Sequence, residues 1–118
     1  MKRFFPGATW RGVLVGGLAL GVAITAAQAL SQTASHERVV TMANMSYGQI
    51  PTDLKVGDTI VWVNHDTVPH TVTARDKSFD VRVNVGQTVR QPLTRAGVFP
   101  FICIYHAAMR GTLTVAAK

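Results

Sequence analysis

Cysteine is almost absent from this sequence: Cys103 stands alone among 118 residues, so the chain contains no disulfide bond of its own. Acidic residues are also few, six against twelve basic ones, and the basic residues are scattered along the chain. No stripe of basic residues alternates with aromatic side chains, which argues against nucleic-acid binding. The length suits one compact domain and is too short for two.

Charge is missing entirely from Val13 to Ala27, and Ala27-Gln28-Ala29 closes this apolar run with small side chains around one polar residue. The basic residues that precede the run are Lys2, Arg3 and Arg11. A basic start, an apolar run and a small-residue exit predict a secretory signal peptide over residues 1–29. The domain that remains, residues 30–118, has nine basic and six acidic residues and a net charge of +3.

A membrane anchor is the alternative for the same segment. The uncharged stretch 12–35 is just long enough to span a bilayer, although its glycines weaken such a helix. Export through a signal peptide predicts a periplasmic location, where oxidising conditions make an exposed lone thiol a liability. Cys103 is therefore either a buried inert thiol or a thiol protected by a metal bond.

Residues 30–118 also lack a convincing helical period. β-branched and aromatic residues gather instead in short stretches between turn residues. The predicted strand-rich stretches are Arg38–Met42, Tyr47–Val56, Thr59–Asn64, His70–Thr73, Phe79–Val83, Val98–Cys103 and Gly111–Val115. Val85–Val89 is predicted to hold a turn and the start of a further strand. About seven or eight short strands at regular spacing predict an all-β protein, a Greek-key β-sandwich.

Four side chains stand out as candidate metal ligands: His70, Cys103, His106 and Met109. The last three share one C-x-x-H-x-x-M segment between two predicted strands, and a tight loop of that length can wrap three side chains around one point. His70 begins another predicted strand and can supply the fourth ligand. Taken singly, each residue also has an ordinary structural explanation, so the interpretation depends on their conjunction.

The ligand types indicate copper. One thiolate, two imidazoles and one thioether form a soft set, with methionine as the weak axial ligand of a trigonal site. Zinc prefers a closed tetrahedral set of cysteine and histidine. A metal enclosed by protein on all sides has no open position for a substrate, which favours electron transfer over catalysis.

The domain resembles the cupredoxins, and within them the amicyanin and plastocyanin-like group. The matching stretches are Met45-Ser46-Tyr47, Lys55 to Thr59, Val61 to Asn64, Pro69-His70, and Ala96-Gly97 through Cys103, His106 and Met109 to Gly111. The two-residue gap between His106 and Met109 is the short loop typical of amicyanins.

The resemblance implies one type 1 (blue) copper ion per chain. His70 and His106 would be its nitrogen ligands, Cys103 its thiolate and Met109 its axial sulfur. The function implied is that of an exported monomer that shuttles single electrons between redox partners such as a c-type cytochrome and a dehydrogenase. The resemblance also implies an apolar docking patch around His106, for which the candidates are Met45, Val68, Pro69, Ala107 and Ala108.

Two positions depart from the family pattern. Thr71 follows the first ligand histidine where asparagine is usual, and Ala107 follows His106 where proline is usual. Hydrogen bonding near the thiolate and the stiffness of the loop are therefore expected to differ. The alternative function is a periplasmic copper-binding or carrier protein, although the clusters of methionine and histidine typical of carriers are missing. We expect no enzymatic activity, because copper enzymes with a second copper centre need more than four histidines.

Overall fold

The computed structural model describes Gly12, Gly16, Gly17 and residues 35–118. Apart from those three glycines, the predicted signal peptide or anchor, residues 1–29, lies outside the described residues, and so does its boundary after Ala29. No helix in the described part of the chain has the length and apolar character needed to cross a membrane.

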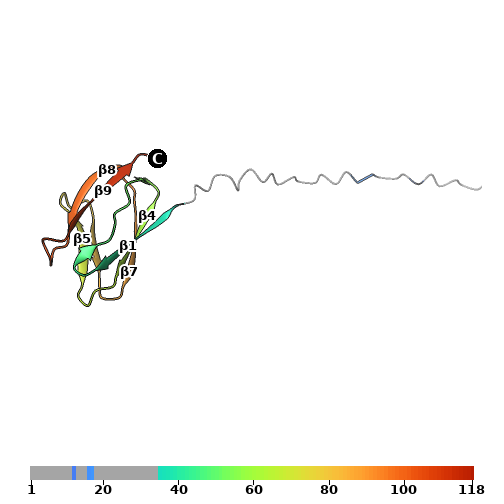
Figure 1. Cartoon of the computed structure of the whole chain (residues 1–118). Helices are drawn as coiled ribbons and strands as arrows, with labels where there is room; N and C mark the ends of the chain where they lie inside the picture. The colour runs from blue at the N-terminus through green and yellow to red at the C-terminus, as the bar shows by residue number, and fades with distance from the viewer. Residues whose placement is uncertain (1–11, 13–15, 18–34) are drawn as a thin grey trace, which may run out of the picture. The chain divides into compact units, whose positions relative to one another are not determined.

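Nine strands among the described residues form two sheets, and Figure 1 shows them arranged as a sandwich. One sheet has the strand order β2-β1-β4-β7 and the other β3-β9-β8-β5-β6. The strands are β1 (Glu37–Ala43), β2 (Ser46–Tyr47), β3 (Leu54–Lys55), β4 (Thr59–Asn64), β5 (His70–Ala74), β6 (Asp80–Val83), β7 (Thr88–Pro92), β8 (Gly97–Ile102) and β9 (Arg110–Ala116). The predicted all-β sandwich is confirmed.

One predicted stretch, Tyr47–Val56, differs in detail. It contains the end of β2 and all of β3, which lie in different sheets, and the residues between them form no strand. Gly48 turns the chain back, because its N–H donates to the carbonyl of Thr41 at 2.7 Å. Pro51 has no N–H to donate and cannot continue a strand ladder. Local β propensity had joined two short strands that this turn separates.

Aromatic residues fill the space between the sheets. Trp62 and Phe101 are fully buried and lie edge to face at 5.7 Å, and Tyr47 packs against both rings. The indole N–H of Trp62 donates to Gln91 Oε1 at 2.8 Å, so this buried polar atom is satisfied. In the central β4, four of the six residues are buried and the other two are partly buried, which explains its nearly continuous apolar sequence.

The strand pairing decides where the candidate ligands lie. β5 and β8 are antiparallel, with Thr73 opposite Ile102 and Ala74 opposite Phe101. The start of β5, at His70, therefore lies at the same end of the sheet as the residue after β8, Cys103. β8 and β9 are antiparallel neighbours, and their pairing ends with Ile102 opposite Arg110. The loop of residues 103–109 joins the two strands and closes this end of the sandwich.

Candidate metal centre

His70, Cys103 and His106 converge at this end of the sandwich, with their potential ligand atoms within 4.8 Å of one another. Cys103 Sγ lies 3.8 Å from His70 Nδ1 and 3.7 Å from His106 Nδ1. His70 and Cys103 are fully buried, and His106 is half-buried. The structure thus brings together three of the four predicted ligands.

These separations fit a metal ion held in common. Metal–sulfur and metal–nitrogen bonds of about 2.3 and 2.0 Å that meet at 120° place sulfur and nitrogen about 3.7 Å apart. The sulfur–nitrogen distances of 3.7 and 3.8 Å are close to that value. One sulfur and two imidazoles form a soft donor set suited to a transition metal rather than to magnesium or calcium.

Asp66 orients His70 from the connection between β4 and β5. Its Oδ2 lies 2.6 Å from His70 Nε2, so Nε2 carries the proton and Nδ1 keeps a lone pair facing Cys103. The same carboxylate accepts the N–H groups of Asn44, at 2.6 Å, and Met45, at 3.0 Å. Burial opposes ionisation, but hydrogen bonds from His70 and these two amides hold the pKa of Asp66 below its usual value.

Thr71 contacts both Cys103 and the residue that follows it, Ile104. Its N–H points at Cys103 Sγ across 3.4 Å, and its hydroxyl accepts the N–H of Ile104 at 3.0 Å. Its carbonyl accepts the hydroxyl of Tyr47, whose pKa is raised first by burial and then by the charge of Cys103. The hydroxyl therefore braces the ligand loop at the position where the family usually has asparagine.

Three backbone hydrogen bonds close the loop itself. Cys103 N–H donates to the carbonyl of Met109 at 3.0 Å, and Met109 N–H donates to the carbonyl of His106 at 2.8 Å. His106 N–H completes the set by donating to the carbonyl of Cys103 at 3.3 Å. Met109 is 3% exposed and belongs to the same packed cluster of side chains as Cys103. Its role as a ligand stays a prediction.

The surface beside His106 is apolar. The five predicted patch residues are all exposed or half-buried, and Ile104 and Tyr105 extend the apolar surface with exposures of 55% and 45%. The guanidinium of Arg82 lies 5.7 Å from the ring of Tyr105. The sequence analysis did not predict that Ile104 and Tyr105 belong to this apolar surface, nor that Asp66 orients His70. The only signal for Asp66 in the sequence was its position, four residues before His70.

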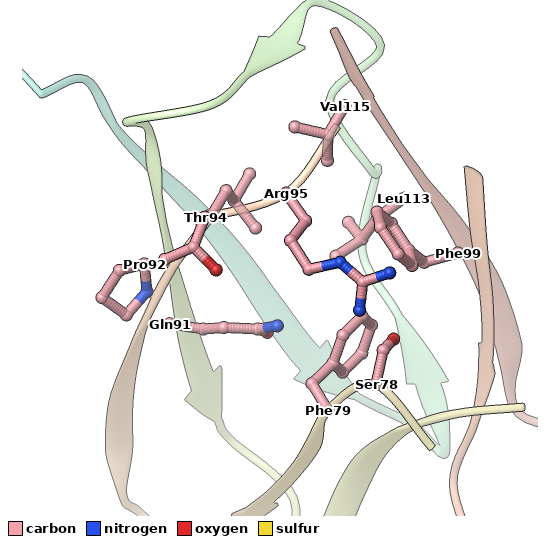
Figure 2. Close-up of a pocket in the computed structure, with 10 residues that line it drawn as sticks. Ser78, Phe79, Gln91, Pro92, Thr94, Arg95, Phe99, Leu113 and Val115 are labelled. Carbon is pink, nitrogen blue, oxygen red and sulfur yellow. The ribbon is translucent and has the colours of Figure 1, made fainter. Parts of the chain in front are cut away.

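A separate pocket of about 180 Å³ lies between the sheets beyond the opposite end of β5. Leu113 and Val115 line it, and Figure 2 shows Arg95 reaching toward Ser78 and Phe79. None of its lining residues is a candidate ligand. The pocket therefore contributes nothing to the metal centre.

The fold and this cluster together define a class of protein: a single β-sandwich with one thiol and two imidazoles gathered where a loop closes one end. The family model for the cupredoxin-like domain matches residues 16–115, and the chain belongs to that family.

Within the family, the chain is similar to amicyanin. It is 29% identical to amicyanin of Paracoccus denitrificans over 93 residues, which cover 74% of this chain and 71% of that protein. A reduced tryptophan-to-tyrosine mutant of amicyanin superposes with a TM-score of 0.60 at 27% identity, covering 74% of this chain and 87% of that one. The Cu(I) form of a methionine-to-alanine mutant of amicyanin gives 0.59 at 29% identity with the same coverage. The resemblance inferred from the sequence is confirmed.

Proposed function

We propose that this protein is a type 1 copper protein that carries single electrons between redox partners. The observation that carries the proposal is the position of Cys103 Sγ between two imidazole nitrogens at 3.7 and 3.8 Å. His70, Cys103 and His106 are assigned as the equatorial ligands and Met109 as the axial one. Similarity to amicyanin, a protein solved in a Cu(I) form, supports copper as the metal.

A copper ion in such a donor set supplies a one-electron redox couple. The chain's own residues hold the set in place. Asp66 fixes the ring of His70, and Thr71, in β5, restrains Cys103, which follows β8. Complete burial of Cys103 keeps water and substrates away from the thiolate, which supports a carrier rather than an enzyme.

His106 is the natural exit for the electron, because it belongs to the cluster and is also partly exposed. The apolar surface around it suits transient docking of a redox protein such as a c-type cytochrome or a dehydrogenase. A domain charge of +3 favours a partner with an acidic surface through electrostatic steering.

The proposal includes export. Residues 1–29 would act as a signal peptide, and residues 30–118 would form the periplasmic copper domain. Cell fractionation followed by N-terminal sequencing tests this point. A mature protein that begins at Leu30 supports cleavage, whereas a membrane-bound chain that retains residue 1 supports the anchor.

A visible absorption spectrum of the copper-loaded protein tests the metal centre. We expect an intense orange-red band that a mild reductant bleaches and reoxidation restores. Cys103→Ala should abolish the band, while the control His65→Ala, at an exposed histidine outside the cluster, should keep it. A folded, copper-loaded protein without the band would contradict the proposal and favour the copper-carrier alternative.

A further inference from the structure

A chain of hydrogen bonds leads from the ligand loop to the outer face of the β5–β6 pair. Ile104 N–H donates to Thr71 Oγ1 at 3.0 Å, and Thr71 Oγ1 lies 2.9 Å from Thr73 Oγ1. Thr73 Oγ1 in turn donates to Asp80 Oδ1 at 2.7 Å. We call Thr71, Thr73 and Asp80 the threonine relay.

The strand geometry explains why these residues line up. Side chains two positions apart on a strand share a face, so Thr71 and Thr73 lie on one face of β5 and Val72 lies on the other. Val72 is fully buried in the core. Thr73 pairs with Asp80 across the β5–β6 ladder, which places the carboxylate beside the second hydroxyl.

The direction of the relay is fixed by its two ends. A backbone N–H can only donate, an ionised carboxylate can only accept, and each hydroxyl has a single proton. Because Thr73 gives its proton to Asp80, its oxygen must accept the proton of Thr71. The oxygen of Thr71 is then left to accept from Ile104, and every bond points from the loop toward the carboxylate.

Hydrogen bonds in such a chain strengthen one another, and a charged acceptor at the end strengthens them further. The inner end acts on the peptide that joins Cys103 to Ile104. Thr71 also points its own N–H at Cys103 Sγ, so the residue that anchors the relay contacts the thiolate directly. Thr71 is 2% exposed, so water competes little for the bonds at this inner end, whereas the bond from Thr73 to Asp80 lies at the surface.

We propose that Thr73 and Asp80 are positioning residues for Cys103, which act through Thr71 to hold the thiolate side of the ligand loop. This inference rests on the proposed function for its meaning, since it concerns the geometry of the copper thiolate. Its physical content, a polarised hydrogen bond at Ile104, is a property of the chain itself.

The amide proton of Ile104 reports on the relay by NMR, in the metal-free full chain and again with Cu(I). Thr73→Val removes the middle hydroxyl at nearly constant shape. We expect the Ile104 amide resonance to move upfield and its hydrogen exchange to accelerate about twofold, because the bond from Ile104 to Thr71 is weakened rather than lost. Thr73→Ser should restore both values, and Thr114→Val, an exposed control on β9, should change neither.

Asp80→Asn tests whether the charge acts through the relay or through space. The variant should shift the Ile104 amide upfield in the wild-type background and leave it nearly unchanged in the Thr73→Val background. In the copper-loaded protein, the shift in reduction potential caused by Asp80→Asn should likewise shrink when Thr73 is replaced by valine.

The relay is overturned if Thr73→Val changes neither the resonance nor the hydrogen exchange of the Ile104 amide. It is also overturned if Asp80→Asn shifts that resonance equally in the wild-type and Thr73→Val backgrounds. The proposed function fails separately, through a missing visible band in the wild-type protein. The metal-free NMR result is independent of that band, so the two failures are distinguishable.

Discussion

His70 and His106 present the same ring nitrogen to Cys103 Sγ at nearly the same distance, 3.8 and 3.7 Å, from very different surroundings. His70 belongs to β5, is fully buried and has its second nitrogen on Asp66. His106 is half-buried in a loop held by backbone hydrogen bonds, with exposed neighbours on both sides.

The difference separates two tasks. The β5 side is held by strand pairing and by a carboxylate, so the position of His70 is fixed before any metal arrives. The loop side combines a buried thiol with a histidine that reaches the surface. A centre that passes electrons needs both, because a rigid donor set changes little between oxidation states while an exposed ligand shortens the path to a partner.

The largest contrast is expected from removing each histidine in turn. In the metal-free protein, His70→Ala leaves a buried cavity and removes one hydrogen bond of Asp66, and should lower the free energy of unfolding by about 3 kcal/mol. His106→Ala should lower it by less than about 0.5 kcal/mol, since a partly exposed side chain is lost. Urea denaturation measures both free energies of unfolding. Equal losses for the two variants would contradict the inference that His70 is held more firmly than His106.

Replacing Asp66 weakens the support of His70 without replacing a predicted ligand. Asp66→Ala removes the acceptor for His70 and for two backbone amides, and should lower the free energy of unfolding by about 2 kcal/mol. Asp66→Asn keeps one acceptor oxygen and should lose less. If the alanine variant were as stable as the wild type in urea denaturation, Asp66 would not be what holds His70.

The smallest effect is expected on the loop side. Ala107→Pro restores the residue usual in the family and stiffens the unfolded chain, which should raise the free energy of unfolding by about 0.5 kcal/mol. Ala108→Pro, one position further, serves as the matched comparison. A lower stability for Ala107→Pro, measured in the same urea series, would show that the loop conformation at this position excludes proline.

The sequence predicted the sandwich and the candidate ligands because both depend on local signals. Strand-forming stretches and the spacing of Cys103, His106 and Met109 can be read within a few residues of each other. Asp66 and the threonine relay depend on which residues face each other across strands and turns. The register between β5 and β6 places Thr73 beside Asp80, and no pattern within either strand predicts that pairing.

Other predictions had different outcomes. Tyr47–Val56 was predicted as one strand-rich stretch because its β-forming residues outweighed the turn signals of Gly48 and Pro51. The signal peptide and the ligand role of Met109 remain predictions. The bracing of the loop by Thr71 followed from its hydroxyl, but the continuation to Asp80 required the structure.

Asn44 and Met45 have backbone φ angles of 52° and 58°, a left-handed conformation that is unfavourable for methionine by about 1 kcal/mol. Their amides are held there by the carboxylate that also holds His70. Met45 is 45% exposed and lies in the predicted docking patch. The exposed turn and the buried His70 therefore share one carboxylate as their anchor, and we expect a protein that displaces this turn to strain the hydrogen bond of His70 as well.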